Sequence, residues 1–498
     1  MFSISKKHAI KDYERLKEAA FKACALRQYS KSLQLIACAA GQAYHLNFRY
    51  ADDALEGLLE KISTEVLGQS LELPQEEKYL LYDSFGYDNR GLTQQYLHAL
   101  DTMGVQYLYL VESREFNVNG NIAAQVARNP KAQIIQVPSE LGEVERLDYL
   151  FAAVKEYNPK KAFLHLAPWS TVAVTLWNAF PKVERYLIDL TDHAFWLGKS
   201  CSDYFIGFRE YGYSVSVRER GIPREKLLNL PYYPIVASKP FAGFPEEAKG
   251  RVILFSGGAY YKIYGENDAY FKLVERIVNE NPEVAILFAG SGNEKPFKNF
   301  IAKNGLQRNI FLIGNRTDIN EVFRNCDIYM NSYPVIGGLM SQYAVLNKKP
   351  LIGYSTSDIP CNFSEGLFSA DLHYKTTYTD IDEFHAELNK LICCKARREY
   401  ASNYAPDVLP TPDSFAVALK QLVEDRHPVS FSDFDVHASR FSEVYFAMEN
   451  NYLHKYHAIK FRHLGFRSFL YFPFSSIVSL LSVLRYNLDY INKFIGRV

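Results

Sequence analysis

The sequence predicts an α/β protein with two doubly wound, Rossmann-like domains that face a cleft, preceded by a helical module and followed by a helical tail. Short runs rich in Val, Ile, Leu and Tyr alternate with helical segments, which is typical of parallel βαβ units. The alternation forms two series that meet in a polar loop near residue 240, and 498 residues suit about three domains. We therefore expect four segments: 1–75, 76–240, 241–405 and 406–498.

The first segment is predicted to be helical. Between residues 9 and 65, apolar residues and alanines recur every three or four positions without a proline. The stretch "RQYSKS" at 27–32 predicts the turn of an αα-hairpin. The pattern is similar to one tetratricopeptide unit, whereas a stable array needs about three. A small helical cap or docking module is the prediction.

The next two segments supply the strands. The first series has apolar runs at 78–86, 105–113, 132–138, 161–168 and 185–191, with helices predicted at 91–104 and 143–157. The second has runs at 251–257, 284–290, 309–314, 326–332 and 349–354, with helices at 269–280 and 319–325. Ligands of such sheets bind at the carboxyl ends of the strands, so the site is expected where these ends face the cleft.

The last sixty residues are basic, aromatic and apolar. An uncharged run from Ser468 to Leu484 contains Pro473 and is near the lower limit of transmembrane length. Two interpretations stay open: a packed helix pair, or an amphipathic anchor lying on the inner membrane surface.

Composition excludes some classes of function. Lys plus Arg and Asp plus Glu both number 56, so the basic surface that binds nucleic acid is not expected. The seven cysteines lack metal-ligand spacing, and the N-terminus is polar, which predicts reduced thiols in a cytoplasmic protein. No metal and no cofactor are predicted.

Glycines follow several predicted strands of the second series. Gly257 and Gly258 end one strand, Gly290 follows another, and the pair Gly337–Gly338 precedes a predicted helix. Glycine permits close backbone approach, and a helix N-terminus favours anions. Lys262, near the first pair, would neutralise a phosphate. The alternative is that the glycines only allow tight turns and that the lysine lies on the surface.

The order of the predicted strands, helices and glycine-containing turns resembles that of the GT-B glycosyltransferases over residues 78–400, most strongly over 250–354. The similarity is greatest to the branch that contains O-GlcNAc transferase-like and bacterial protein-glucosyltransferase enzymes, and extends to surface-polysaccharide glycosyltransferases. The resemblance implies a nucleotide-sugar donor site at "YYK", "GNRTDI" and "GGLMSQYA". Its implied residues are Gly257, Gly258, Lys262, Gly290, Asn315, Arg316, Asp318, Gly337, Gly338, Leu339 and Met340.

One departure from the family stands out. Many retaining GT-B enzymes carry two glutamates around this loop, and Val335 and Tyr343 occupy those positions here. An inverting enzyme is therefore favoured, and the contact to the donor ribose stays unassigned.

The first series is expected to bind the acceptor. Asp192, His193 and Trp196 follow a strand predicted to end at Thr191, and a histidine suits the general base of an inverting transfer. The alternative is a histidine bonded to backbone at a helix start. A second loop adds Asp88, Arg90 and Gly91, which would touch substrate or form an ordinary capping turn.

We therefore expect a metal-independent hexosyltransferase that uses a UDP-sugar. The acceptor is a glycan, a lipid-linked saccharide at the inner membrane face, or a protein. Two alternatives remain: a non-catalytic GT-B partner subunit, and a GT-B-shaped nucleotide-sugar epimerase or phosphorylase.

Overall fold

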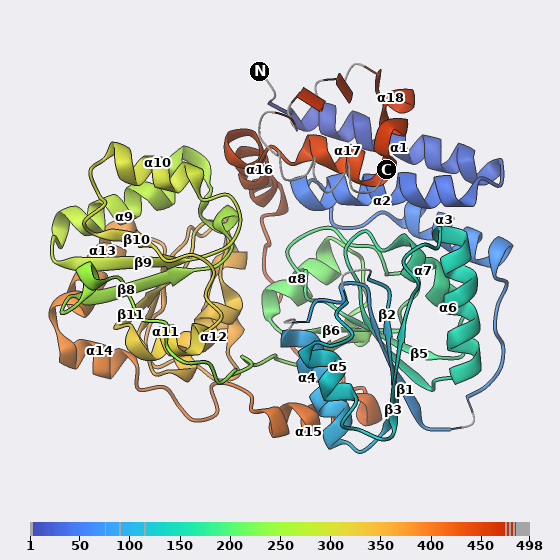
Figure 1. Cartoon of the computed structure of the whole chain (residues 1–498), viewed down its shortest axis with the longest axis horizontal. Helices are drawn as coiled ribbons and strands as arrows, with labels where there is room; N and C mark the ends of the chain where they lie inside the picture. Colours follow the sequence, from blue (N-terminus) through green and yellow to red (C-terminus); the bar gives the residue numbers. More distant parts are fainter. Residues whose placement is uncertain are drawn as a thin grey trace. The chain divides into compact units, whose positions relative to one another are not determined.

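The computed structural model describes residues 3–74, 76–88, 91–113, 116–473, 476, 477, 480, 481 and 484 (Figure 1). The chain forms two compact units. Unit 1 takes Met1–Leu230, Pro412–Asp433 and the residues from His454 onward, and unit 2 takes Pro231–Thr411 and Phe434–Leu453. The expected tail, 406–498, is therefore divided between the two units.

Unit 1 is built on a seven-stranded parallel sheet. Its order, β3-β2-β1-β4-β5-β6-β7, reverses direction between β1 and β4. The strands are β1 Lys78–Asp83, β2 Gln106–Val111, β3 Ala132–Gln136, β4 Lys161–His165, β5 Glu184–Ile188, β6 Tyr204–Gly207 and β7 Leu227–Asn229. The accompanying helices are α4 Gly91–Thr102, α5 Asn121–Val126, α6 Glu143–Tyr157, α7 Thr171–Asn178, α8 Glu210–Arg218 and η1 Arg224–Lys226.

Unit 2 repeats this topology with six parallel strands. The order β10-β9-β8-β11-β12-β13 reverses between β8 and β11. The strands are β8 Val252–Gly257, β9 Val284–Ala289, β10 Ile310–Leu312, β11 Ile328–Met330, β12 Leu351–Tyr354 and β13 Thr377–Tyr378. The main helices are α9 Ala269–Glu280, α10 Lys295–Lys303, α11 Ile319–Asn325, α12 Gly338–Leu346, α13 Ile381–Cys393, α14 Lys395–Ala401 and α16 Ala438–Met448.

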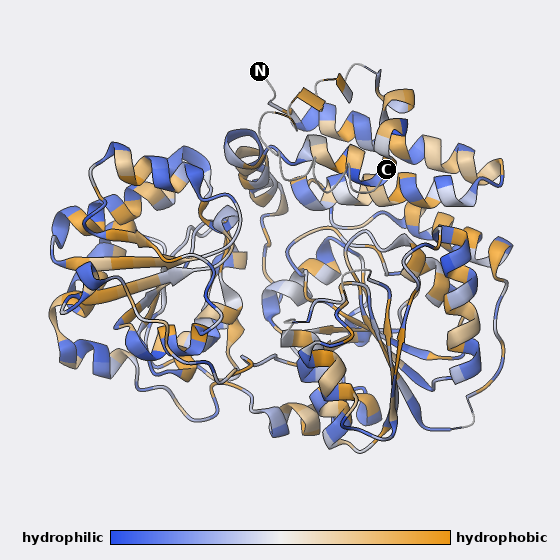
Figure 2. Cartoon of the chain, viewed as in Figure 1, coloured by the Kyte–Doolittle hydropathy of each residue, from blue (hydrophilic) through white to orange (hydrophobic). Residues whose placement is uncertain are grey.

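These sheets confirm the predicted α/β class. The inner strands are buried along nearly their whole length, as expected where helices cover both faces of a parallel sheet, and Figure 2 shows them mainly as hydrophobic ribbons. Differences from the prediction lie at the edge strands β7 and β13 and at β6 beside β7, which are short and lack a long apolar run. In addition, β5 ends at Ile188, three residues before the expected Thr191.

The N-terminal helices pack within unit 1. Helices α1 Lys6–Ala25 and α2 Tyr29–Leu46 form the predicted hairpin, and α3 Asp53–Val66 follows. Helix α17 Tyr456–Leu464 returns from the end of the chain to pack against α2 (Figure 1). Tyr456 donates a hydrogen bond to Asp12 of α1 over 3.1 Å, and the buried Lys460 pairs with the same carboxylate. We refer to α1, α2, α3 and α17 as the helical module.

The linker between the sheets belongs to unit 2 from Pro231 onward, although the sequence placed the boundary at residue 240. The reason is that two side chains of α12 bond the linker. Gln342 donates a hydrogen bond to the Tyr232 carbonyl over 2.9 Å, and the Tyr343 hydroxyl donates to the Ile235 carbonyl. These contacts bind the linker to the helix that the glycine pair begins.

Within the described part of the chain, no helix has both the length and the apolar character needed to cross a bilayer.

One carboxylate joins the helical module to the loop after β5. Glu56 of α3 is buried and accepts hydrogen bonds from the backbone N–H groups of Gly198, Lys199 and Ser200 over 2.8–3.1 Å. The Ser200 hydroxyl adds a fourth bond over 2.7 Å. The carboxylate fills a concave set of backbone donors of the kind that binds anions.

Replacing Glu56 should destabilise the loop after β5. We expect Glu56→Ala to lower the stability of unit 1 by about 2–3 kcal/mol, because buried donors lose a charged acceptor. Hydrogen exchange should show lost protection at the amides of residues 198–200. Glu60→Ala, on an exposed position of the same helix, is the control. Equal effects of the two variants would contradict the role given to Glu56.

Candidate functional site

The start of α12 lies at the point where the sheet of unit 2 reverses direction. Strands β8 and β11 are neighbours there, and the chain continues from β8 into Gly257–Lys262 and from β11 into the loop that ends at Gly337. Ligands of open α/β sheets bind at this kind of position. The first N–H groups of α12 lack acceptors within the helix, so they offer hydrogen bonds and a positive dipole end to an anion.

Buried polar side chains hold the loop before α12. The Asn331 side chain accepts a hydrogen bond from the Gly337 N–H over 2.9 Å and donates to the Ser341 hydroxyl over 2.9 Å. Ser332 donates to the Val335 carbonyl over 2.7 Å. Asn331 is not predictable as a site residue, because a single asparagine after a strand carries no recognisable pattern.

Two of the predicted glycines are needed for close packing. A Cβ atom at Gly290 would lie 2.3 Å from the carbonyl oxygen of Gly258, and one at Gly257 would lie 2.8 Å from the carbonyl oxygen of Ala289 and 3.0 Å from the Met340 methyl group of α12. The Gly258 N–H donates to the Ala289 carbonyl over 2.9 Å, which joins the ends of β8 and β9. The glycines therefore bring these strand ends and α12 close together.

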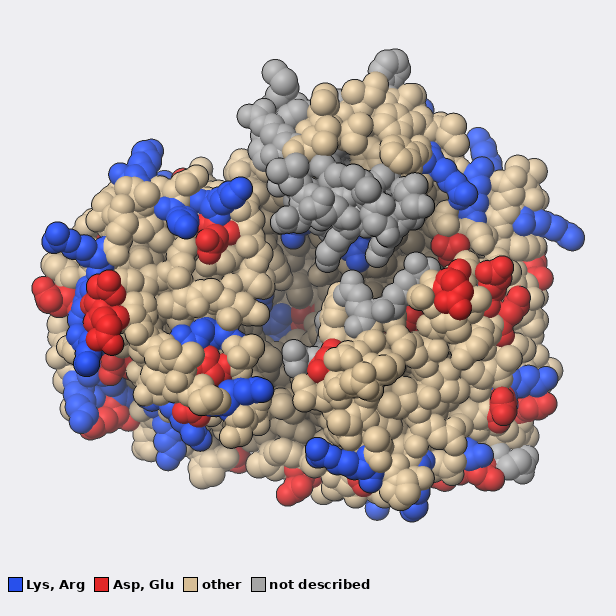
Figure 3. Space-filling view, in the orientation of Figure 1, with Lys and Arg blue, Asp and Glu red and all other residues tan. Residues whose placement is uncertain are grey.

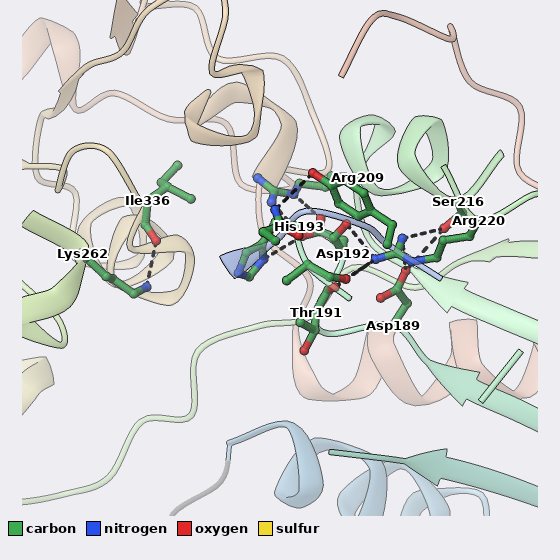
Figure 4. A network of polar contacts seen from close by, with 12 residues as sticks. Asp189, Thr191, Asp192, His193, Arg209, Ser216, Arg220, Lys262 and Ile336 are labelled. Atoms are coloured by element: carbon green, nitrogen blue, oxygen red, sulfur yellow. Dashed lines mark hydrogen bonds and ion pairs between the residues drawn. The ribbon is translucent and has the colours of Figure 1, made fainter. Parts of the chain in front are cut away.

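Lys262 lies beside the start of α12. It belongs to η3 Tyr260–Ile263, and its ammonium group donates a hydrogen bond to the Ile336 carbonyl over 2.8 Å (Figure 4). The Val335 N–H in turn donates to the Lys262 carbonyl over 3.2 Å. The structure therefore brings Lys262 to the residue that precedes Gly337. Leu339 is exposed in the first turn, and Met340 packs beside Gly257.

The loop "GNRTDI" of the predicted donor site is held by contacts within unit 2. Arg316 forms two hydrogen bonds with Asp318 over 2.7 and 2.6 Å, and these bonds lower the pKa of Asp318 to about 2. Asp318 accepts a hydrogen bond from the Ala242 N–H over 2.8 Å, and Arg316 donates to the Gly243 carbonyl over 2.8 Å. The pair thus fixes the linker before β8. Asn315, in contrast, is exposed.

The two positions that depart from the family pattern are buried. Val335 lies in the loop that pairs with Lys262, and Tyr343 bonds the linker. A carboxylate that the sequence analysis missed lies farther along the chain, at Glu365. It accepts hydrogen bonds from the N–H and hydroxyl groups of both Thr376 and Thr377 over 2.7–3.0 Å. Although burial opposes ionisation, these donors lower the pKa of Glu365.

In unit 1, the loop after β5 is organised around the buried Arg220. Its guanidinium group donates to the carbonyl oxygens of Thr191, Asp192 and Ala194 over 2.8–3.2 Å (Figure 4). It also lies 4.7 Å from the centre of the Trp196 ring. Trp196, expected at the cleft, is 5% exposed and packs in a core cluster with Leu187 and Phe205.

The loop presents His193 beside a charged, buried carboxylate. Arg209 donates two hydrogen bonds to Asp192 over 2.6 and 2.9 Å, and His193 Nδ1 lies 3.3 Å from Asp192 Oδ1 (Figure 4). Burial alone would raise the pKa of Asp192, but Arg209 and His193 hold it well below its usual range. Burial raises the pKa of the neighbouring Asp189 to about 6, with Arg220 opposing. Asp192 is therefore ionised at neutral pH and well below it.

The helical module also holds the backbone of this loop. Asn47, the residue that follows α2, donates a hydrogen bond from its side chain to the His193 carbonyl over 2.9 Å, and Glu56 of α3 binds the amides a few residues later. The His193 side chain is 24% exposed, whereas that of Asp192 is 2% exposed. A partly accessible imidazole on a rigid loop, oriented by a charged carboxylate, is suited to accept a proton.

The second predicted loop of unit 1 has a capping role. Asp88 accepts hydrogen bonds from the Ile122 N–H and the Asn121 side chain, both over 3.0 Å, and so caps α5. Gly91 begins α4. Arg90 lies outside the described residues. The buried Asp83 ends β1 and contacts His165, Tyr109 and Thr93 over 2.9–3.2 Å.

Across the described ranges, no group of three or more His, Cys, Asp or Glu side chains gathers in a way that would hold a metal ion.

The two sheets define the GT-B fold. Comparison with solved structures shows the same fold. No protein-family model matches the sequence, and no curated protein matches it. The crystal structure of Anabaena HepE with UDP and glucose is 12% identical, covering 70% of this chain and 100% of that chain at a TM-score of 0.51. HepE with UDP-glucose gives a TM-score of 0.50. A Thermobaculum terrenum O-GlcNAc transferase mutant, 11% identical, covers 90% of this chain and 85% of that chain at 0.47.

The charge on Asp192 should make the stability of unit 1 depend on pH. A carboxyl whose pKa is lower in the folded chain stabilises it above the ordinary pKa of aspartate, about 4, and loses this effect as the pH falls further. Asp192→Asn should therefore be clearly less stable than the parent at about pH 7. The difference should shrink below about pH 4.

Urea unfolding of both proteins across this pH range checks the expectation. Asp148→Asn, on an exposed position of α6, is the control and should change little at any pH. A stability difference for Asp192→Asn that stays constant down to about pH 3 would contradict the charged pair with Arg209.

Proposed function

We propose that this chain is a glycosyltransferase that moves a sugar from a UDP-sugar to an acceptor hydroxyl or amide, without a metal ion and with inversion. The observation that carries the proposal is the hydrogen bond between Lys262 and the carbonyl of Ile336, two residues before α12 begins. It brings a cation to a helix N-terminus at the switch point of a GT-B unit. The HepE crystals contain UDP or UDP-glucose, which supports the same ligand class here.

The donor site stabilises the leaving group. As the bond between the anomeric carbon and the diphosphate oxygen breaks, its electron pair goes to that oxygen. Lys262 and the first N–H groups of α12 would stabilise the resulting charge, as preorganised donors do where an anion develops. Asn331 keeps the loop before Gly337 in place for this purpose.

His193 is the proposed base. With Nδ1–H donated to the ionised Asp192, its Nε2 carries the lone pair that takes the acceptor proton while the acceptor atom bonds to the anomeric carbon. Arg209 fixes the carboxylate and therefore the imidazole. Asp192 is thus a positioning residue in this mechanism.

The acceptor has two candidates. A lipid-linked saccharide of surface-polysaccharide assembly is favoured by the basic, aromatic tail, and a protein by the helical module. Transfer assays with a membrane extract and with a denatured protein extract, each using radiolabelled donor, distinguish them.

Nucleotide binding tests the donor site. UDP and UDP-sugars should raise the unfolding temperature, because a ligand that binds the native state stabilises it by mass action. Lys262→Ala should weaken UDP binding about tenfold or more, since it removes a charge-assisted contact. Calorimetry measures this affinity, and Lys298→Ala, an exposed lysine of α10, is the control. Equal UDP affinity of parent and Lys262→Ala would refute the site.

His193→Ala tests the base. The variant should lose about 10²–10⁴-fold in transfer rate, the usual effect of removing a general base, while UDP affinity stays near that of the parent. His98→Ala on α4 is the control. A His193→Ala variant that transfers at the parental rate would refute this role.

The remaining outcomes identify the rival functions. UDP binding by the parent without turnover of any UDP-sugar would indicate a non-catalytic partner subunit. Conversion of the UDP-sugar without an acceptor would indicate an epimerase or, with inorganic phosphate, a phosphorylase.

A further inference from the structure

Basic and aromatic side chains from three parts of unit 1 meet around Trp169, in the loop after β4. The guanidinium group of Arg462 in α17 lies over the Trp169 ring, 4.9 Å from its centre. The ring centres of His45 in α2 and His463 in α17 lie 6.3 and 6.1 Å from that of Trp169. Lys455 directly precedes α17. We call these five residues the basic cluster.

The basic groups of this cluster act on one another. Burial, followed by the charges of Lys455 and Arg462, lowers the pKa of His45 to about 3. The imidazole of His45 is therefore uncharged at neutral pH. Like charges held close together oppose folding, and proteins arrange such clusters where they bind a ligand of the opposite charge.

The cations of the basic cluster differ from their neighbours in lacking an acidic partner. Lys460 of the same helix pairs with Asp12, and Figure 3 shows Lys and Arg groups next to Asp and Glu groups over much of the visible surface. Among the residues that the structure describes, neither Lys455 nor Arg462 forms an ion pair with Asp or Glu.

Arg462 is held in a position suited to an anion. Contact with the Trp169 ring fixes the plane of its guanidinium group, and a stacked guanidinium can still donate hydrogen bonds from its edge. Arg462 is exposed, and His45 and Lys455 are partly exposed, so a ligand can reach all three. Two adjacent N–H groups of arginine match two oxygens of a phosphate group.

Hydrogen bonds join the basic cluster to the loop that carries the proposed base. The Leu197 N–H donates to the carbonyl of Pro168, the residue before Trp169, over 3.0 Å. Asn47, two residues after His45, donates to the His193 carbonyl over 2.9 Å. The basic cluster therefore lies at the same carboxyl edge of the sheet as His193, where ligands of α/β sheets bind.

We propose that the basic cluster binds a phosphate group carried by the acceptor. Arg462 would bind two phosphate oxygens, and Lys455 would add a second positive charge. The acceptor is then a phosphorylated saccharide, either soluble or linked to a lipid through its phosphate, and not a protein. This inference rests on the proposed function, because it assigns the cluster to the acceptor of sugar transfer.

Calorimetry of the full chain with glucose 6-phosphate as the probe tests the basic cluster. With UDP present at saturation to occupy the donor site, the parent should bind glucose 6-phosphate but not glucose. Arg462→Gln and Lys455→Gln should each weaken this binding about tenfold or more, since each removes a charge-assisted contact. Arg467→Gln is the matched control, because Arg467 is exposed and bonds Gln34 over 3.3 Å, and it should bind like the parent.

Three results would overturn the inference, provided that thermal melts show folded protein. These are no binding of glucose 6-phosphate by the parent, equal affinities of the parent and Arg462→Gln, and sulfate binding as tight as that of glucose 6-phosphate, which would indicate an adventitious ion only. UDP affinity is measured in the same samples. A chain that binds UDP but not glucose 6-phosphate refutes this inference alone, and the reverse result refutes the donor site alone.

Transfer assays distinguish the two sources of the phosphate. Label from a radioactive UDP-sugar that enters an organic-solvent extract of membranes indicates a lipid-linked acceptor, and label that enters added hexose phosphates indicates a soluble one. With either acceptor, Arg462→Gln should raise the acceptor KM about tenfold or more and leave the donor KM unchanged. Label that enters only phosphate-free protein, or an unchanged acceptor KM, would contradict the inference.

Discussion

A buried guanidinium group determines the shape of the loop that carries His193. The side chain of Arg220 is fully buried, and such a cation is tolerated only when acceptors surround it. The carbonyl oxygens of Thr191, Asp192 and Ala194 accept its hydrogen bonds. The Asp189 carboxylate lies 3.6 Å away, and the Trp196 ring covers the guanidinium group. The chain after β5 therefore curls around Arg220. As a result, Asp192 meets Arg209, and His193 stays partly exposed.

The fold was predictable because two parallel sheets require long apolar strands. Strand β9, buried along its whole length, shows the pattern that the sequence analysis used. The edge strands β7 and β13 were missed because three or two residues carry no periodicity. The packing of α17 against α2 was also beyond prediction, since the contact joins residues more than four hundred positions apart.

The candidate site could be proposed from sequence only where residue type and chain position coincide. Lys262 and the glycine pairs at 257–258 and 337–338 follow the strands of the reversal point, so a local pattern selected them as candidates. Arg209, Arg220, Asn47 and Glu56 act on the His193 loop from other elements, and no spacing in the sequence connects them with it. For Arg316 and Asp318 the donor-site role stays a prediction; the structure adds that their side chains bond each other and the linker, which the sequence pattern did not indicate.

The packing of α17 against the N-terminal helices affects the order in which the chain can fold during its synthesis. Helices α1 and α2 leave the ribosome first, and α17 leaves it only after the whole of unit 2. Until then, the surface of α2 that later receives Ile459 is uncovered, and Asp12 lacks its buried lysine partner. Domains usually fold in the order of their synthesis. Here the first unit to begin is the last to finish, so the nascent chain exposes the surface of α2 that later receives Ile459 until α17 has been made.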